Sequence, residues 1–311
     1  MERNIALSVR PARPRMGMWK QEAMWFYILA SPWILGFLIF TLYPMVSSLY
    51  LSFTNWDLLS PAKAVGLDNY RQLFFDDPLF RQSLVNTFYF AGLSVPLSLL
   101  VSLWLASILN QRVIGMGIFR TIFYLPSLVP LVATSLLFSS LFAPTTGLIN
   151  RGLALVGITG PAWLLDASWV IPALVLMSLW GLGGGTVLLL AGMRGIPREL
   201  YEAAAIDGAA ERQVFWRITV PMLTPILFFN LVISVIGGLQ TFTQVYILTK
   251  GGPDNASSML VPYLFDTAFR YYKMGYASAM AWVLFFIILA LTALVFRSSS
   301  LWVFYESEAR K

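Results

Sequence analysis

The sequence predicts an all-α membrane protein with six transmembrane helices. The chain has 311 residues, of which 58% are hydrophobic and only 12% are charged, whereas a soluble domain carries about 25% charged residues. Six apolar runs are each long enough to cross a bilayer, which takes about 20 helical residues. These runs cover residues 25–52, 83–110, 120–143, 169–192, 222–248 and 275–296.

The two ends of the chain are expected to lie outside the membrane domain. Residues 1–24 are rich in arginine and predict a basic cytoplasmic tail. A cleaved signal peptide is the alternative, but the apolar run that follows is too long and lacks a small-residue cleavage site. The six-helix domain is therefore expected over residues 25–297, and residues 298–311 form a second cytoplasmic tail.

Basic residues predict the orientation of the chain in the bilayer. With the N-terminus inside, fourteen of the 21 Lys and Arg residues fall in cytoplasmic segments and seven fall outside. Positive residues accumulate on the cytoplasmic side of membrane proteins. Both termini, and the polar loop 193–221, are therefore expected in the cytoplasm.

The composition excludes several classes of site. The chain has no Cys and no His, which rules out disulfides, a catalytic Cys, thiolate or imidazole metal sites and a His proton relay. The net charge of +6 is interpreted as orientation information, because the basic residues are scattered through short loops and form no nucleic-acid-binding stripe. No metal site and no nucleic-acid partner are expected.

The polar segment 193–221 separates the fourth and fifth apolar runs and predicts two short helices. Pro197 suits a first helical position, because its missing N–H has no helical partner there. Gly208 can adopt the left-handed conformation that turns a chain out of a helix. The second helix is expected over Ala209–Ile218, with Pro221 opening the fifth run.

This segment also carries a recognisable pattern, formed by Glu202-Ala203-Ala204, Asp207-Gly208, Ile218 and Pro221. The pattern resembles the EAA loop of the permease subunits of binding-protein-dependent ABC importers, of the carbohydrate-uptake type. An ordinary amphipathic cytoplasmic loop is the alternative interpretation. The likeness extends from about residue 25 to 297, and includes Lys250-Gly251-Gly252-Pro253 after the fifth run and Gly275-Tyr276-Ala277 at the start of the sixth.

The resemblance implies the type I ABC importer permease fold and a coupling helix that docks in a cleft on a separate ATPase. The coupling residues that it implies are Arg198, Glu199, Glu202, Ala203, Ala204, Asp207, Gly208, Phe215, Ile218 and Pro221. Its implied partners are a second, homologous permease in a heterodimer, a cytoplasmic ATPase dimer and an extracytoplasmic substrate-binding protein. The implied location is the bacterial inner membrane.

The chain itself is not expected to be an enzyme. It has no Gly-x-x-x-x-Gly-Lys-Ser/Thr phosphate-binding loop, so ATP and Mg²⁺ would be held by the partner ATPase and no cofactor by this chain. The interiors of the apolar runs carry no Asp, Glu, Lys or Arg, which argues against a proton-coupled carrier. A self-sufficient channel or a sodium-coupled carrier remains the alternative from a different class.

The fourth and fifth runs hold the candidates for a substrate pathway. Four glycines within residues 181–185 are expected to weaken or kink the fourth helix, because glycine costs about 1 kcal/mol relative to alanine in a helix. Irregular backbone at this depth is tolerated inside protein or beside a wet cavity. Close packing through small residues is the alternative explanation.

Uncharged hydrogen-bonding residues of the fifth run recur at helical spacing and would line one face. Such a face suits a sugar, whose hydroxyls need both donors and acceptors, although these residues also suit hydrogen bonding between helices. A glycerol phosphate or another small solute is the alternative substrate. The pathway candidates of both runs are Trp180, Gly184, Asn230, Ser234, Gly238, Gln240, Thr241 and Gln244.

Overall fold

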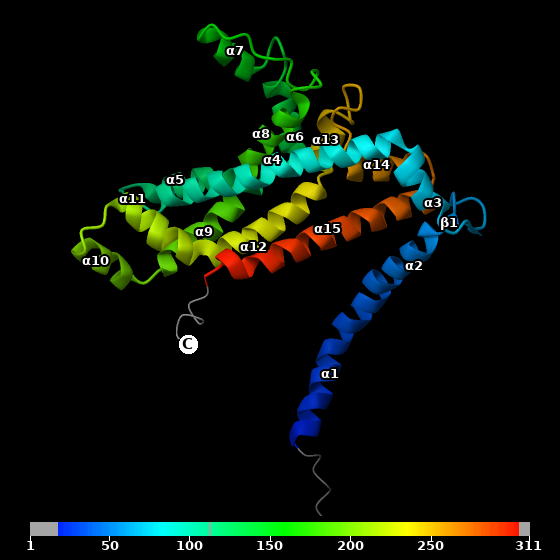
Figure 1. Ribbon diagram of the computed structural model, residues 1–311, viewed down its shortest axis with the longest axis horizontal. Coiled ribbons are helices and arrows are strands. Elements are labelled where there is room, and N and C mark those ends of the chain that lie inside the picture. The colour runs from blue at the N-terminus through cyan, green and yellow to red at the C-terminus, as the bar shows by residue number, and fades with distance from the viewer. Residues whose placement is uncertain (1–17, 112, 305–311) are drawn as a thin grey trace, which may run out of the picture.

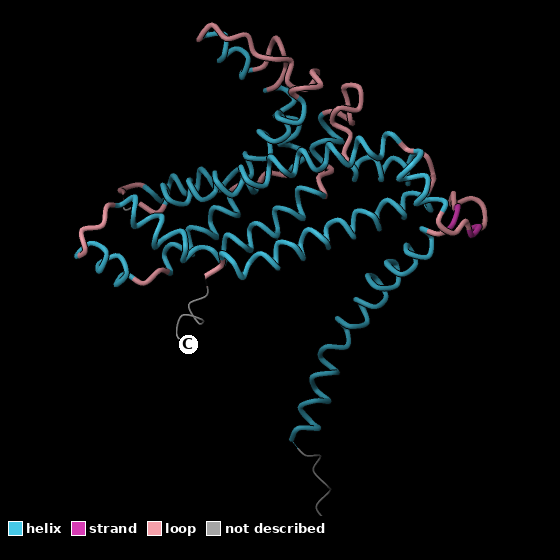
Figure 2. Tube along the Cα trace, viewed as in Figure 1, coloured by secondary structure: helices cyan, strands magenta, loops and turns pink. Residues whose placement is uncertain are grey.

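The computed structural model describes residues 18–111 and 113–304, and its regular elements are almost all helices (Figures 1 and 2). Four helical segments have the length and hydropathy of a membrane span: Trp19–Ser52, Pro78–Leu109, Glu211–Leu248 and Met274–Trp302. Two further pairs of helices reach the length of a span only when each bent pair is counted as one. The six predicted runs thus correspond to four long helical segments and two sharply bent pairs.

The first span begins earlier than predicted and stands apart from the other helices (Figure 1). It consists of α1 (Met18–Phe37), a π-helical turn η1 (Leu38–Leu42) and α2 (Tyr43–Ser52). Residues 18–24, which were assigned to the tail, are therefore helical, and the rest of that tail lies outside the described residues. None of the described side chains of α1 and η1 is buried.

The first and last spans meet at the far end of α2. The Trp282 indole of α15 (Met274–Trp302) donates a hydrogen bond to the Ser48 hydroxyl at 3.2 Å, and the Gly275 amide donates to the Trp56 carbonyl at 3.2 Å. A Cβ at Gly275 would overlap the Thr54 carbonyl, so only glycine permits this close approach. The N-terminal span is therefore joined to the body through α2 and α15.

The segment between the first two spans forms a small cap. Two antiparallel strands, β1 (Thr54–Asn55) and β2 (Lys63–Ala64), form a hairpin that had no clear signal in the sequence. A short helix α3 (Asp68–Arg71) and a π-helical turn η2 (Gln72–Asp76) follow. The Asn69 side chain donates to the Ser52 and Thr54 carbonyls and so fastens α3 to the end of α2.

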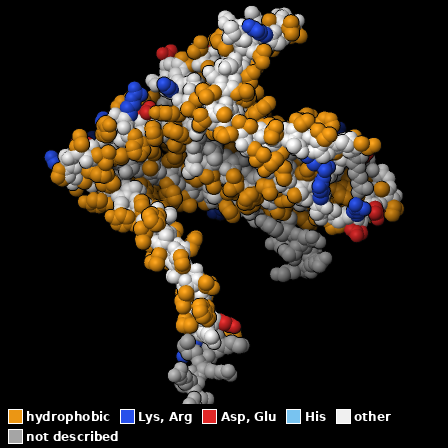
Figure 3. Space-filling view, turned by 180° about the vertical axis from the view of Figure 1, so that it is seen from behind, with side chains coloured by type: hydrophobic (Ala, Val, Ile, Leu, Met, Phe, Trp, Pro, Cys, Tyr) orange, Lys and Arg blue, Asp and Glu red, His pale blue; other side chains and the backbone are white. Residues whose placement is uncertain are grey.

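Helix α4 (Pro78–Leu109) is the central element, and α8, α9, α12 and α14 pack against it. Apolar side chains form one buried cluster near its start, around Phe80 and Ala91, and another near its end, around Leu103 and Leu109. A third cluster joins Phe90 to α8. The surface view shows hydrophobic side chains across the middle of one face and charged ones toward its ends (Figure 3), as expected of a protein in a bilayer.

The third span is bent by 99°. Pro126 and Pro130 lie at this bend, and proline removes a backbone donor and disfavours helix in the residue before it. The elements here are α5 (Met116–Tyr124), the 3₁₀ turn η3 (Leu125–Leu128), α6 (Leu131–Leu141) and, in the following loop, α7 (Leu148–Leu155).

The fourth span confirms the predicted glycine-rich kink. Helix α8 (Val170–Ser178) and the 3₁₀ turn η4 (Leu179–Gly181) meet α9 (Gly183–Gly195) at 49°. A Cβ at Gly183 would lie 2.7 Å from the Ser127 hydroxyl and 3.1 Å from Tyr124 Cα. Glycine therefore serves both expected purposes here, because it breaks the helix and lets the two bent spans touch.

The loop and the last spans differ from the prediction in their boundaries. The second predicted helix of the loop is no separate unit, because it continues directly into the fifth span. The helix of that span is interrupted at residues 240–242. The remaining elements are α10 (Arg198–Ile206), α11 (Glu211–Val214), η5 (Phe215–Thr219), α12 (Val220–Leu239), α13 (Thr243–Leu248), α14 (Leu260–Phe265), η6 (Asp266–Arg270) and α15, which runs six residues beyond residue 296.

A buried carboxylate fastens the start of α4 to the last third of the chain. Asp77 Oδ1 accepts the Phe80 amide at 2.9 Å and so caps α4, and Oδ2 accepts the hydroxyls of Tyr263 and Tyr276 at 2.6 Å each. Burial, and then the bond to Asp77, raise the pKa of the Tyr263 hydroxyl, which therefore stays protonated and donates.

Replacing Asp77 by alanine is expected to destabilise the fold by about 2–4 kcal/mol, because a buried and a half-buried tyrosine hydroxyl and one helix N–H lose a charged acceptor. The thermal unfolding midpoint of the purified protein measures this loss. Asp57→Ala is the matched control, because Asp57 bonds only within its own exposed loop. Equal midpoints for the two variants would contradict the role given to Asp77.

Candidate functional site

Helix α10 forms one end of the molecule, away from α7 and the β-hairpin (Figure 1). Its first residue is Arg198, and Pro197 occupies the N-cap rather than the predicted first helical position. Glu199 lies in the first turn, where the helix dipole favours an anion. The Tyr201 hydroxyl lies 3.1 Å from the Thr219 hydroxyl and so connects α10 to η5.

Gly208 ends α10 in the conformation that the sequence predicts, with φ of +71°. The Ala209 amide donates to the Ala204 carbonyl at 2.9 Å, and the Gly208 amide to the Ala205 carbonyl at 3.1 Å. This pair of bonds is the Schellman motif, which uses a left-handed residue to satisfy the last carbonyls of a helix. The direction in which the chain leaves α10 is therefore fixed by one glycine.

The ten coupling candidates divide into six exposed residues and four residues that are buried or half-buried. Ala204 is buried, and Phe215, Ile218 and Pro221 are half-buried in the base of the fifth span. Ile206, which was not among the candidates, lies at the end of α10. Its apolar side chain is 87% exposed, so the described part of the chain leaves it largely uncovered. The exposed candidates are Arg198, Glu199, Glu202, Ala203, Asp207 and Gly208.

A cavity of about 480 Å³ lies among the middle portions of the spans. Five of the eight pathway candidates line it, although the helix break at 240–242 means that they do not share one continuous helical face. Among the described residues its lining includes no charged side chain. The five candidates in its wall are Ser234, Gly238, Gln240, Thr241 and Gln244.

The other three candidates lie outside this cavity. Asn230 is buried and its side-chain amide is 3.5 Å from the Gly185 carbonyl, so it hydrogen-bonds between helices as the alternative interpretation proposed. The Trp180 ring lies edge-on to Phe138, with centroids 5.9 Å apart. Gly184 is exposed and does not line the cavity.

The sequence reasoning missed a second wall of the cavity. Ser94 and Ser98 of α4 and Ser178 of α8 add hydroxyls, and Phe90 and Phe242 add aromatic rings. The two α4 serines are four residues apart within an apolar run, which places them on one helical face and was a usable signal. Hydroxyls, amides and aromatic rings together can bind a polyhydroxylated molecule by hydrogen bonds and stacking.

The breaks in three membrane spans converge on this cavity. Leu131 follows the bend of the third span, Gly181 lies at the bend of the fourth, and residues 240–242 break the fifth. All of these line the cavity. Broken helices leave backbone polar groups free, which membranes tolerate only inside protein or beside water. Interrupted backbone of three spans therefore lies beside this cavity.

Comparison with known proteins places the chain in a family. The family described as "Binding-protein-dependent transport system inner membrane component" matches residues 98–301. The probable ABC transporter permease protein YesP of Bacillus subtilis is 44% identical over 91% of this chain and 92% of its own length. The lactose transport system permease protein LacF of Rhizobium radiobacter is 35% identical over 87% and 92%.

A solved structure agrees with the fold. A chain of a bacterial ABC transporter involved in the import of alginate superposes with a TM-score of 0.80 at 24% identity, over 92% of this chain and 99% of that one. This is a multi-pass membrane protein of the permease class that serves ABC importers. The chain belongs to the binding-protein-dependent transport system inner membrane component family, which confirms the resemblance inferred from the EAA loop.

Two adjacent glycines beside the cavity should respond differently to a side chain. A Cβ at Gly238 would lie 3.3 Å from Ala91 Cβ and 3.4 Å from Val95, whereas no atom lies within 4 Å of one at Gly237. Gly238→Val is therefore expected to lower stability by about 1–3 kcal/mol through overpacking against α4. Gly237→Val is the control, and a comparable fall in its unfolding temperature would contradict the packing described.

Proposed function

We propose that this chain is one of two permease subunits of an ATP-driven importer that carries a mono- or oligosaccharide across the bacterial inner membrane. The observation that carries the proposal is the uncharged, hydroxyl- and amide-lined cavity at the helix breaks of a permease fold. Relatives in the same family are named for lactose, arabinooligosaccharides and trehalose/maltose. These names support a sugar as the substrate class.

The eight pathway candidates have unequal support for this role. Ser234, Gly238, Gln240, Thr241 and Gln244 would contact the passing sugar, because they line the cavity. The serines of α4 would complete the opposite wall. Trp180, Gly184 and Asn230 would act through helix packing around the bends.

The exposed group on α10 would contact the ATPase, which would hold ATP and Mg²⁺ on the cytoplasmic side. Both termini would then lie in the cytoplasm, as the distribution of basic residues indicates. Closure of the ATPase would push α10, and η5 and α12 would transmit the displacement toward the cavity. Helix α12 can do this because it begins directly after η5 and its last turns line the cavity. The loop must bind the two ATPase states with different affinity for this to occur.

Two further partners follow from the exposed parts of the chain. The unburied helix α1 would pack against a second, homologous permease in a heterodimer. A substrate-binding protein would dock at the end that carries α7 and the Gly251–Ser258 loop. One matched structure is an alginate ABC transporter in complex with an alginate-bound periplasmic protein, which supports a partner of this kind.

Filling the cavity should stop transport. Gly237→Leu places a side chain at a cavity-lining position where no atom lies within 4 Å, so the complex is expected to assemble normally while uptake is lost. Proteoliposomes holding the co-purified complex would be tested with radiolabelled lactose, arabinooligosaccharides, trehalose and maltose. Undiminished uptake by this variant, for a sugar that the unmodified complex imports, would contradict the proposed pathway.

Altering the turn after α10 should uncouple hydrolysis from transport. Gly208→Val forces a β-branched residue into a left-handed conformation, at a cost of about 1–2 kcal/mol. Sugar transported per ATP hydrolysed is expected to fall by about tenfold, which corresponds to 1.4 kcal/mol. Gly195→Val is the control, because Gly195 has an ordinary φ and open space. Normal coupling in the Gly208 variant would count against this mechanism.

A further inference from the structure

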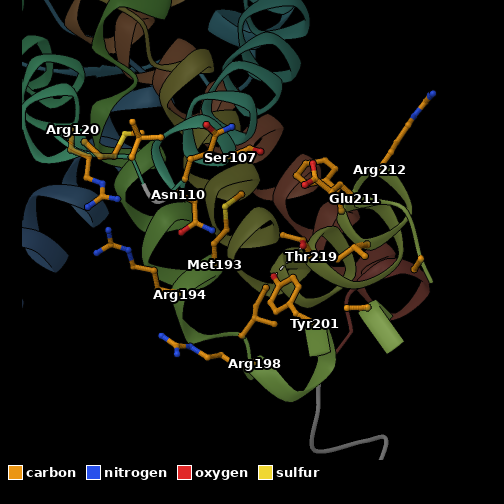
Figure 4. A pocket seen from close by; sticks show the side chains of 18 of the residues that line it. Ser107, Asn110, Arg120, Met193, Arg194, Arg198, Tyr201, Glu211, Arg212 and Thr219 are labelled. Atoms are coloured by element: carbon orange, nitrogen blue, oxygen red, sulfur yellow. Dashed lines mark hydrogen bonds between the residues drawn. The ribbon is translucent and has the colours of Figure 1, made fainter. Parts of the chain in front are cut away.

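A second and larger cleft, of about 1170 Å³, lies at the α10 end of the molecule and takes no part in the proposed sugar pathway. The ends of α4 and α9, the start of α5 and the loop helices α10 and α11 surround it (Figure 4). Four arginines line this cleft, and among the described residues of its wall Glu211 is the only carboxylate. The cleft is therefore strongly cationic.

Three of the arginines lie along one side of the cleft. Arg120 comes from α5, Arg194 from the last turn of α9 and Arg198 from the first turn of α10. Figure 4 shows their guanidinium groups on the same side of the view, whereas Arg212 extends to the opposite side. Guanidinium groups stay charged at all physiological pH values, so this arrangement is favourable when an anion lies among them.

One of the three guanidiniums is held in place by the backbone. Arg120 Nε and Nη2 donate to the Leu109 carbonyl at 3.0 and 2.8 Å. Leu109 is the last residue of α4, so the arginine also satisfies a free helix carbonyl. A fixed cation at the mouth of the cleft reduces the entropy lost when a ligand binds there.

The outer surface of α5 is apolar and uncovered beside this arginine. Ile118, Phe119 and Ile122 are 67%, 53% and 56% exposed. Basic pockets between membrane helices, next to apolar surface, bind the phosphate head groups of anionic lipids. A phospholipid could use both the arginines and this apolar surface, whereas a free soluble anion would use the arginines alone.

We propose that the cleft binds the phosphate head group of an anionic phospholipid. Arg120, Arg194 and Arg198 would bind the head group, and the acyl chains would lie along the exposed face of α5. The lipid belongs to the cytoplasmic leaflet if the predicted orientation is correct. The binding itself depends neither on that orientation nor on the identity of the sugar.

The ATPase is the competing occupant, and Arg198 is the one member of the exposed coupling group that also lines the cleft. Tyr201 and Ala205 line the cleft together with Arg198, as residues three and seven positions apart on one helical face. Glu199, Glu202 and Ile206 are exposed and do not line it. One face of α10 can therefore remain available to an ATPase while the other borders the lipid.

The test measures lipid retained by the purified complex after exchange into nanodiscs of phosphatidylcholine with or without phosphatidylglycerol. Native mass spectrometry would count bound phosphatidylglycerol per complex. The double variant Arg194→Gln/Arg198→Gln is expected to weaken retention by roughly fivefold per arginine, or about 25-fold in all. Arg212→Gln, which removes one charge from the same cleft but points away, is expected to retain the lipid.

A conservative variant separates lost charge from lost folding. Arg194→Lys/Arg198→Lys keeps both charges and is expected to restore most of the retention, and unfolding temperatures would accompany each measurement. Equal retention by the unmodified protein and the Gln variant would overturn the proposal. Binding of inorganic phosphate without any preference for phosphatidylglycerol would overturn it in favour of a soluble anion. Loss of the ATPase from the Gln variant with unchanged lipid would assign the cleft to the ATPase.

Discussion

A helix that crosses a bilayer has to satisfy its own backbone hydrogen bonds, and three of the described spans interrupt their helices beside a single cavity. The breaks in the third, fourth and fifth spans all border the 480 Å³ cavity, while α4 passes it unbroken for 32 residues. Free amides and carbonyls at these breaks need partners other than lipid. Helix α4 provides the wall against which the interrupted helices pack. The polar lining comes from the α4 serines and from residues at the breaks.

The same arrangement joins the two ends of the molecule. Helix α12 starts beside the hydrogen bond between Tyr201 and Thr219 and ends at the cavity. Gly208 fixes the direction in which the chain leaves α10. In the proposed mechanism, a displacement of α10 would be transmitted to the cavity through a short series of packed elements. A coupling free energy between the two sites would require that these packed elements adopt two arrangements, each favoured by one state of the ATPase.

The sequence predicted the fold well where hydrophobicity and glycine chemistry dominate. Long apolar runs identify membrane helices because the bilayer imposes both length and composition. The kink at residues 181–185 and the left-handed Gly208 also follow from backbone sterics alone. The 99° bend at Pro126 and Pro130 was missed, because proline often lies in membrane helices whose neighbours supply the missing bonds.

The site was only partly predictable, for a tertiary reason. Periodicity placed Asn230, Ser234, Thr241 and Gln244 on one face, but the helix is interrupted at residues 240–242, so the four do not share one continuous helical face. Thr241 and Gln244 reach the cavity through that break, and Asn230 turns to Gly185 instead. The arginine cleft has little signal in sequence order, because Arg120 lies more than 70 residues before Arg194 and Arg198 and meets them only in the folded chain.

The contact between α2 and α15 has a consequence for biosynthesis. The ribosome releases the first span long before the last, yet Ser48 and Trp56 find their partners Trp282 and Gly275 on α15. Contacts this distant in sequence close late and slow the folding of a chain. These contacts of the first span and the segment after it can therefore form only when synthesis of the chain is almost complete. A chain shortened before α15 would leave that span without its attachment to the body.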